Sequence, residues 1–179
     1  HAHGDEGMQR AILGGVKTIE HGTLMSEKTM EMMKQYNVYY VPTITAGKEV
    51  GEKAKLKGYY PDIIVPKAIE IGPKIQATFE KAYKKGVKIA FGTDAGVFPH
   101  GLNAKEFGYM VEVGMSEMHA IQSATIVNAA LLNNDFIGSI EKGNFADIIA
   151  VNEDPTEHIK TLENVVFVMK NGVIIVSAE

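Results

Sequence analysis

The sequence predicts an α/β fold in which short buried strands alternate with helices, followed by a small all-β element. Three apolar runs of strand length in the first part of the chain are each followed by a helical pattern, and two of them end at a titratable residue. This alternation is typical of α/β barrels and doubly wound sheets. A complete (β/α)8 barrel needs about 250 residues, so a chain of 179 residues with three visible strands favours the second half of such a barrel. We therefore expect a partial barrel over residues 1–135 and a β element over residues 136–179.

Residues 4–41 are expected to form two helices and two strands. Apolar residues spaced three and four positions apart predict helices over residues 4–14 and 27–36, and Ser26 is a suitable N-cap for the second. Brief apolar runs over residues 16–20 and 38–41 predict the strands. The side chains assigned to the buried helix faces are Met8, Ala11 and Ile12, then Met30, Met33 and Tyr36.

The segment over residues 43–73 is long and rich in Lys, Gly and Pro. We expect a broken helix there rather than a structureless loop, and long segments of this kind often cover a site. A firm helix is expected after Pro73, ending at Gly86. The apolar run over residues 87–91 then predicts a strand buried on both faces.

The rest of the chain is expected to hold two more helices and a hairpin. One helix is predicted over residues 103–113 and a last long one from Ser116 to about Asn133. Beyond them the period changes to that of strands, at residues 146–151, 165–169 and 173–176. The pair Asn171-Gly172 between the last two strands is a strong hairpin signal.

Composition excludes several classes of function. The net charge is −4, and no block of like charges reaches the length that would indicate a nucleic-acid partner. No apolar run approaches the roughly 20 residues of a membrane helix, and no leader pattern opens the sequence, so we expect a cytoplasmic protein. Because the chain has no cysteine, any metal must be bound by histidines and carboxylates.

Three titratable residues follow strand positions and are candidates for one site. His1, His21 and Asp94 are each expected at the carboxyl end of a strand, where catalytic groups of parallel α/β folds gather. Imidazole suits zinc, and a carboxylate can both bind a metal and transfer a proton, so together they predict a metal site. A single histidine is more often structural, and an Asp after a strand often caps the next turn.

Other candidate residues have two interpretations each. His100, in the loop after Asp94, could contact a substrate or be a plain loop histidine. The glycines around Asp94 could cradle a phosphate through backbone N–H groups, but the Asp94 carboxylate would repel it. His119 and His158 are interpreted as structural or solvated.

Five motifs resemble the amidohydrolase superfamily, and within it the branch of Xaa-Pro dipeptidases and imidazolonepropionase-like enzymes. They extend over nearly the whole chain. The motifs are His1-Ala-His-Gly4, Ile19-Glu-His-Gly-Thr23, Val41-Pro-Thr43, Phe91-Gly-Thr-Asp-Ala-Gly96, and Gly138 to Pro155.

The resemblance implies a role for each residue of the site. It makes His1 the metal ligand after strand five, His21 the ligand after strand six, and Asp94 the catalytic residue and ligand after strand eight. The family motif has two histidines after strand five, and we assign the ligand to the first, which leaves His3, with His100, as a candidate substrate contact. The metal is expected to be zinc, with one or two ions in the complete enzyme.

The resemblance also implies a function and missing parts. It implies a metal-dependent hydrolase of amide or peptide-like C–N bonds, acting on a dipeptide or an N-acyl amino acid. The family's His-x-His pair after strand one and carboxylated Lys after strand four are absent from this sequence. We therefore expect a C-terminal portion that is inactive alone and whose partner is the N-terminal half of the barrel. The closing strands would join a composite β-sandwich.

Alternatives remain open at this point. One is a deaminase or cyclic-amide hydrolase on the same scaffold, and another is a non-catalytic half-barrel that acts as an assembly partner. A homo-oligomer is also open.

Overall fold

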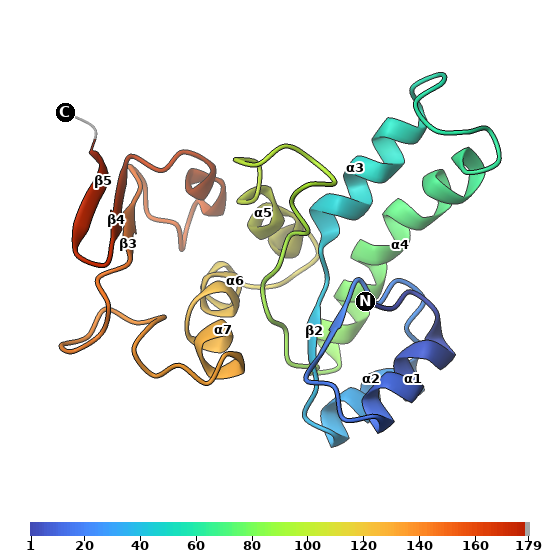
Figure 1. Ribbon diagram of the computed structural model, residues 1–179, viewed down its shortest axis with the longest axis horizontal. Helices are drawn as coiled ribbons and strands as arrows, with labels where there is room; N and C mark the ends of the chain where they lie inside the picture. Colours follow the sequence, from blue (N-terminus) through green and yellow to red (C-terminus); the bar gives the residue numbers. More distant parts are fainter. Residues whose placement is uncertain (178–179) are drawn as a thin grey trace.

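A computed structural model of the chain describes residues 1–177 and has a mixed α/β fold (Figure 1). Helices and short strands alternate in the first part and strands close the chain, as the sequence predicts. The elements are, in chain order, α1 (Asp5–Leu13), β1 (Thr18–Glu20), α2 (Glu27–Gln35), β2 (Tyr39–Val41), α3 (Ile44–Ala54), α4 (Val65–Lys84), α5 (Lys105–Glu112), α6 (Glu117–Ala124), α7 (Ile126–Leu131), β3 (Ile148–Ala150), η1 (Ile159–Glu163), β4 (Phe167–Lys170) and β5 (Val173–Ser177).

The first part of the chain is organised around a narrow parallel array. β1 and β2 pair in parallel, and single parallel bridges extend the array on both sides, from Ala2 to His21 and from Tyr40 to Ile89. Helices make the crossovers, as parallel neighbours require. The carboxyl ends of these segments therefore lie at the same edge of the array.

The expected strand over residues 87–91 is present only as the bridge at Ile89, which corrects the prediction of a full strand. Tyr40 N donates to Lys88 O at 2.8 Å, and Ala90 N donates to Tyr40 O at 2.9 Å. Phe91 N then donates to Ser123 O at 3.2 Å instead of continuing the ladder. This segment pairs with a neighbouring strand on one side only. The pairing ends at Phe91, whose N–H group bonds to Ser123 of α6.

Helices α1 and α2 form as predicted, with one exception on the buried face of α2. Ser26 Oγ accepts a hydrogen bond from Thr29 N at 3.2 Å, which confirms the predicted N-cap. Met30 and Met33 are fully buried. Tyr36 is 48% exposed, because it lies at the C-cap of α2, where the chain turns away through Asn37.

Helices α3 and α4 form an antiparallel pair, and the sequence prediction for this region is wrong in one respect (Figure 1). The firm helix begins at Val65 rather than after Pro73, which lies inside α4. A proline removes one hydrogen bond of the helix ladder, but close packing holds the two helices together here. A Cβ added to Gly72 would lie 2.7 Å from Gly47 O, so only glycine permits this contact.

The single long helix expected after Ser116 is two helices, α6 and α7. They are separated at Thr125, whose backbone is far from helical (φ −117°, ψ −98°). Thr125 Oγ1 donates to Ile121 O at 2.9 Å, a side-chain bond that competes with the helix ladder and bends helices. The spacing of apolar residues along the sequence does not reveal such a break.

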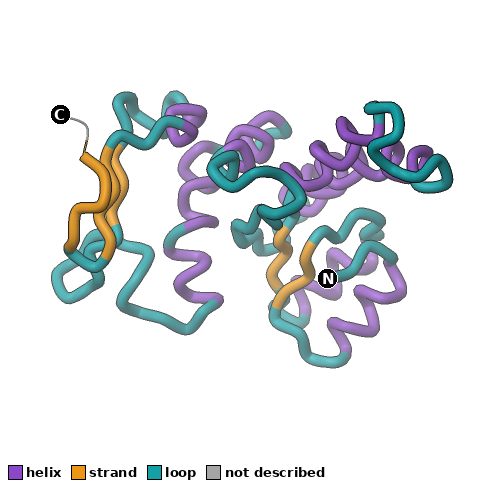
Figure 2. The backbone as a smooth tube through the Cα atoms, turned by 45° about the horizontal axis from the view of Figure 1, so that its top comes forward, coloured by secondary structure: helices purple, strands orange, loops and turns teal. Residues whose placement is uncertain are grey.

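The closing strands form a separate antiparallel sheet in the order β3-β4-β5, at one end of the molecule and apart from β1 and β2 (Figure 2). Asn171 and Gly172 both have positive φ (49° and 79°), as a two-residue hairpin turn of type I′ requires. The predicted hairpin is therefore confirmed. The apolar side chains of β5 are exposed: Val173, Ile174, Ile175 and Val176.

Glu106 of α5 is a fully buried carboxylate that joins α5 to the start of α3. It accepts hydrogen bonds from Ile44 N at 2.7 Å, Thr45 N at 2.7 Å and Thr45 Oγ1 at 2.6 Å. These donors include N–H groups that a helix start leaves without partners. Burial raises the pKa of Glu106 to about 7, although the three donors act in the opposite direction.

No helix within residues 1–177 is both long and apolar enough to cross a membrane.

We predict that Glu106→Gln lowers the free energy of unfolding by about 2 kcal/mol at pH 5, because an amide nitrogen cannot accept a hydrogen bond, whereas both oxygens of the carboxyl group, even when it is protonated, can accept one from Ile44 or Thr45. The pKa of Glu106 rises from an ordinary 4.5 to about 7 on folding. Between pH 4.5 and pH 7 the folded protein keeps a proton on Glu106 that the unfolded chain releases. The contribution of Glu106 to the free energy of unfolding therefore decreases as the pH rises through this range. The difference between the two proteins should therefore narrow from pH 5 to pH 7 in urea denaturation.

Glu112→Gln is the matched control, since Glu112 is an exposed acid on the same helix whose carboxylate lies 3.5 Å from the Lys48 ammonium. An exposed pair of this kind contributes under about 1 kcal/mol. Equal losses in the two variants, or a difference that does not change with pH, would contradict the role given to Glu106.

Candidate metal centre

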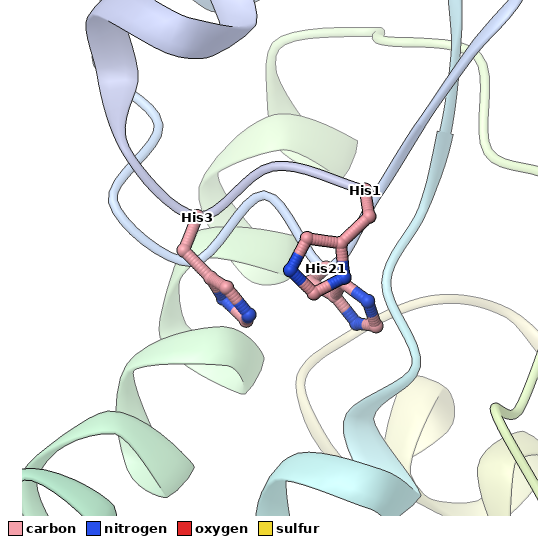
Figure 3. A group of neighbouring side chains, drawn as sticks. All are labelled: His1, His3 and His21. Carbon is pink, nitrogen blue, oxygen red and sulfur yellow. The ribbon is translucent and has the colours of Figure 1, made fainter.

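Three histidine side chains converge at the carboxyl edge of the parallel array (Figure 3). One ring nitrogen from each of His1, His3 and His21 lies within 4.8 Å of the others. The ring centroids of His1 and His21 are 4.4 Å apart, and those of His3 and His21 are 4.9 Å apart. Imidazole nitrogens gathered in this way are a donor set that zinc and similar ions accept.

Backbone pairing places the three rings on one side. Gly22 N donates to Ala2 O at 3.0 Å, and Ala2 N donates to Glu20 O at 3.3 Å. In an extended segment, alternate side chains point to the same face. The side chains of His1 and His3 therefore point to the same face of this extended segment, beside His21. The alternation His-Ala-His allows both rings to reach the cluster.

Hydrogen bonding fixes the orientation and the tautomer of His21. Its Nδ1 lies 2.7 Å from Thr43 Oγ1, and the Thr43 hydroxyl donates to Pro42 O at 2.7 Å. Because the hydroxyl proton is used in that bond, the oxygen must accept a proton from Nδ1. We infer that Nε2 of neutral His21 keeps its lone pair, the form that binds a metal. Nδ1 of His3 has a similar neighbour, Thr23 Oγ1, at 2.7 Å.

The surroundings also keep these rings neutral. Burial lowers the pKa of His21, and the nearby His3 lowers it further, while Asp94 acts in the opposite direction. Burial lowers the pKa of His3, assisted by the positive charge of Lys67. Since a metal binds the unprotonated ring, these shifts extend metal binding to lower pH.

Asp94 lies in the loop after Ala90 and lines the same cavity as the three histidines. Its backbone is left-handed (φ 56°), a conformation that Asp tolerates better than most residues. The loop is tied to α3, since Lys53 Nζ donates to Val97 O at 2.6 Å. Asp94 is therefore near the histidines, but the group whose nitrogens lie within 4.8 Å contains only the histidines.

The cavity over the histidines has a volume of about 310 Å³. Its walls are mainly apolar, and α3 and α4 supply most of them, with Val50 on one helix and Ile71 and Ile75 on the other. A larger cavity of about 540 Å³ lies on another face of these helices and beside α5, and none of the three histidines lines it. We place the candidate site in the smaller cavity because the convergent imidazoles and Asp94 are there.

The structure thus brings His1, His21 and Asp94 to one cavity, and adds His3 to the histidine cluster. His100 is exposed and is not among the residues that line this cavity. Their roles as ligands, catalytic residue or substrate contacts stay predictions. Sequence reasoning did not find the roles of Thr23, Thr43 and Lys67. The signal for Thr43 was present, since it is a hydroxyl residue just beyond β2, at the edge where the histidines gather.

The histidine His119, interpreted from sequence as structural, lies in the first turn of α6. Its Nδ1 is 2.7 Å from the Tyr83 hydroxyl, and it does not line the cavity.

Comparisons with known proteins match this chain over nearly its whole length. Residues 1–175 match the model of the Amidohydrolase family. Ochratoxinase from Aspergillus niger is 33% identical over 179 residues, which cover 96% of this chain and 36% of that protein.

Solved structures give the same result. A Xaa-Pro dipeptidase with methionine bound in its active site superposes with a TM-score of 0.96 and 57% identity, covering 99% of this chain and 44% of the other. A prolidase complexed with N-methylphosphonate-L-proline superposes with a TM-score of 0.88 and 28% identity. The match covers 99% of this chain and 44% of the prolidase chain. The chain therefore spans less than half the length of these relatives.

We predict that Thr43→Val weakens zinc binding by about 10- to 100-fold, the usual effect of removing a hydrogen-bond partner of a ligating histidine. Valine keeps the shape of threonine but cannot accept the Nδ1 proton of His21. Zinc titration against a competing chelator measures the change, with circular dichroism to match the folded fractions.

Thr23→Val is the paired variant, because it removes the same type of partner from His3. If His21 is a ligand and His3 is a substrate contact, Thr23→Val should leave zinc affinity unchanged. Equal losses would make His3 a ligand as well, and a loss confined to Thr23→Val would exchange the two roles.

Proposed function

The chain belongs to the amidohydrolase family, and from this premise we propose that it carries part of the active site of a metal-dependent hydrolase of amide or peptide-like C–N bonds. The observation that carries the proposal is the convergence of three imidazoles on a cavity that Asp94 also lines. The orientation of His21 by Thr43 and the neutral state of His3 and His21 support it.

Each residue has a role in the proposed reaction. His1 and His21 would hold a divalent metal, and their imidazole ligands suit zinc. When bound, such an ion would polarise the scissile carbonyl and lower the pKa of a bound water to about 7. Asp94 would accept a proton from the attacking water and deliver it to the departing nitrogen as the C–N bond breaks. His3 would contact the substrate, and we keep His100 as a second candidate contact.

We propose that the parallel array is the second half of a (β/α)8 barrel, with residues 1–135 as the barrel portion. Within residues 1–177, each outer segment of the array pairs with a neighbour on one side only, and open edges of this kind need cover. A further segment would supply the remaining strands and metal ligands. Residues 136–179 would contribute strands to a β-sandwich, which would cover the exposed apolar side chains of β5.

The names of the relatives favour amide hydrolysis over deamination on the same scaffold. A prolidase and a Xaa-Pro dipeptidase are named for cleaving peptide bonds. We therefore propose a dipeptide or an N-acyl amino acid as the substrate class.

We predict that Asp94→Asn, in the enzyme with its barrel completed, lowers kcat by about 10² to 10⁴-fold and leaves the fold intact, because an amide can neither accept nor deliver the proton. His119→Asn is the control, since His119 lies outside the cavity and bonds to Tyr83. It should change stability modestly and leave kcat unchanged. Release of free amino acid from dipeptides measures the rate.

Two outcomes would change the assignment. Equal losses in both variants, at matched folded fraction and metal content, would remove the special role of Asp94. If only Asp94→Asn loses activity, and the activity decreases in proportion to its metal content, Asp94 would be chiefly a metal ligand.

We further predict that the 179-residue chain alone binds zinc only weakly and turns over no dipeptide at enzymic rates, because affinity depends on the number and geometry of ligands. A zinc titration and a dipeptide assay of the purified chain test this. Nanomolar affinity together with turnover would mean that the site needs no further segment, whereas inactivity even with the barrel completed would favour a non-catalytic protein.

A further inference from the structure

The cavity over the histidines has an uneven distribution of charge. Among the residues 1–177 that line it, Lys67 is the only lysine or arginine and Asp94 is the only carboxylate. Most of the remaining wall is apolar, with Val50, Ile64 and Ile71 among its residues. A ligand in this cavity would therefore meet one cation, the exposed side chain of Lys67, beside a mainly apolar wall.

Lys67 has no anionic partner within residues 1–177, where nine ion pairs are formed by other groups. The sequence around Lys67 gives the reason. Four positions to either side of Lys67 are Ile63 and Ile71, and the only acid within one helical turn is Glu70. Glu70 is already paired with Lys74.

The position of Lys67 in α4 is also unfavourable without an anion. It lies in the first helical turn, which contains no acidic residue and no side-chain cap. The N-terminal end of a helix carries partial positive charge, so a lysine there adds repulsion and an anion there is attracted. The ammonium of Lys67 also acts on the cavity, since its charge reaches the His3 ring.

We propose that Lys67 binds the free carboxylate of the substrate and thereby selects amides derived from amino acids over neutral amides. The apolar body of such a molecule would lie against Val50 and Ile71, and its amide bond would face the histidines. A cavity of about 310 Å³ is at the small end for ligand sites, which suits a molecule the size of a dipeptide or an N-acyl amino acid. This inference rests on the proposed function, because it names the substrate class of the same site.

The test compares two probes that differ only in charge, N-acetyl-L-leucine and N-acetyl-L-leucinamide. Binding of each to the full-length protein is measured by calorimetry, in wild type and in Lys67→Met, Lys67→Arg and Lys81→Met. Lys81→Met is the matched control, because Lys81 is an exposed lysine of the same helix that does not line the cavity.

We expect wild type and Lys81→Met to bind the carboxylate probe about tenfold more tightly than the amide, as a hydrogen bond to a charged group implies. Lys67→Met should lose this preference through weaker binding of the carboxylate probe alone. Lys67→Arg should keep it. The preference of wild type should also decrease as salt is added, because salt screens an accessible ion pair.

A wild type without the preference, including one that binds neither probe, would overturn the proposal, and so would a preference that survives in Lys67→Met. Hydrolysis of the two probes is followed separately. A preference that depends on Lys67 in a protein that cleaves no amide would retain the carboxylate site and reject the hydrolase.

Discussion

The buried carboxylate of Glu106 holds together the elements on which the candidate site depends. It fixes the amides of Ile44 and Thr45 at the start of α3, directly after Thr43, whose hydroxyl orients His21. A side chain from α5 thereby sets the geometry of a histidine on the far side of β2. Burying a charge is costly, and the three donors offset only part of that cost, since burial still raises the pKa of Glu106 to about 7.

A second constraint shapes the cavity above the histidines. The close contact of Gly72 with Gly47 sets the distance between α3 and α4, and the cavity walls come largely from these two helices. The same pair ties down the Asp94 loop, through the bond from Lys53 to Val97. The geometry of the site therefore depends on helix packing as much as on the strands that carry its histidines.

Much of the fold and part of the site followed from local sequence patterns. Some features depend on only a few neighbouring residues, so the local sequence predicts them. These are the alternation of strands and helices, the Ser26 cap and the Asn171-Gly172 hairpin. The positions of His1, His21 and Asp94 after strand segments followed from the same alternation. The start of α4 before Pro73 differs from the prediction because packing against α3 decides it. The break at Thr125 is local, through the bond to Ile121 O, but the spacing of apolar residues does not reveal it.

The sequence by itself determined that an α/β chain without cysteine would present two histidines and one aspartate at a common edge. It did so because strand and turn signals are local and because parallel strands end at one edge. Only the tertiary structure decided that His3 joins His1 and His21, that Thr43 Oγ1 lies 2.7 Å from His21 Nδ1, and that Lys67 lines the cavity without an ion pair within residues 1–177. Those facts depend on distances between residues tens of positions apart, which helix packing and parallel pairing set and which no local pattern encodes.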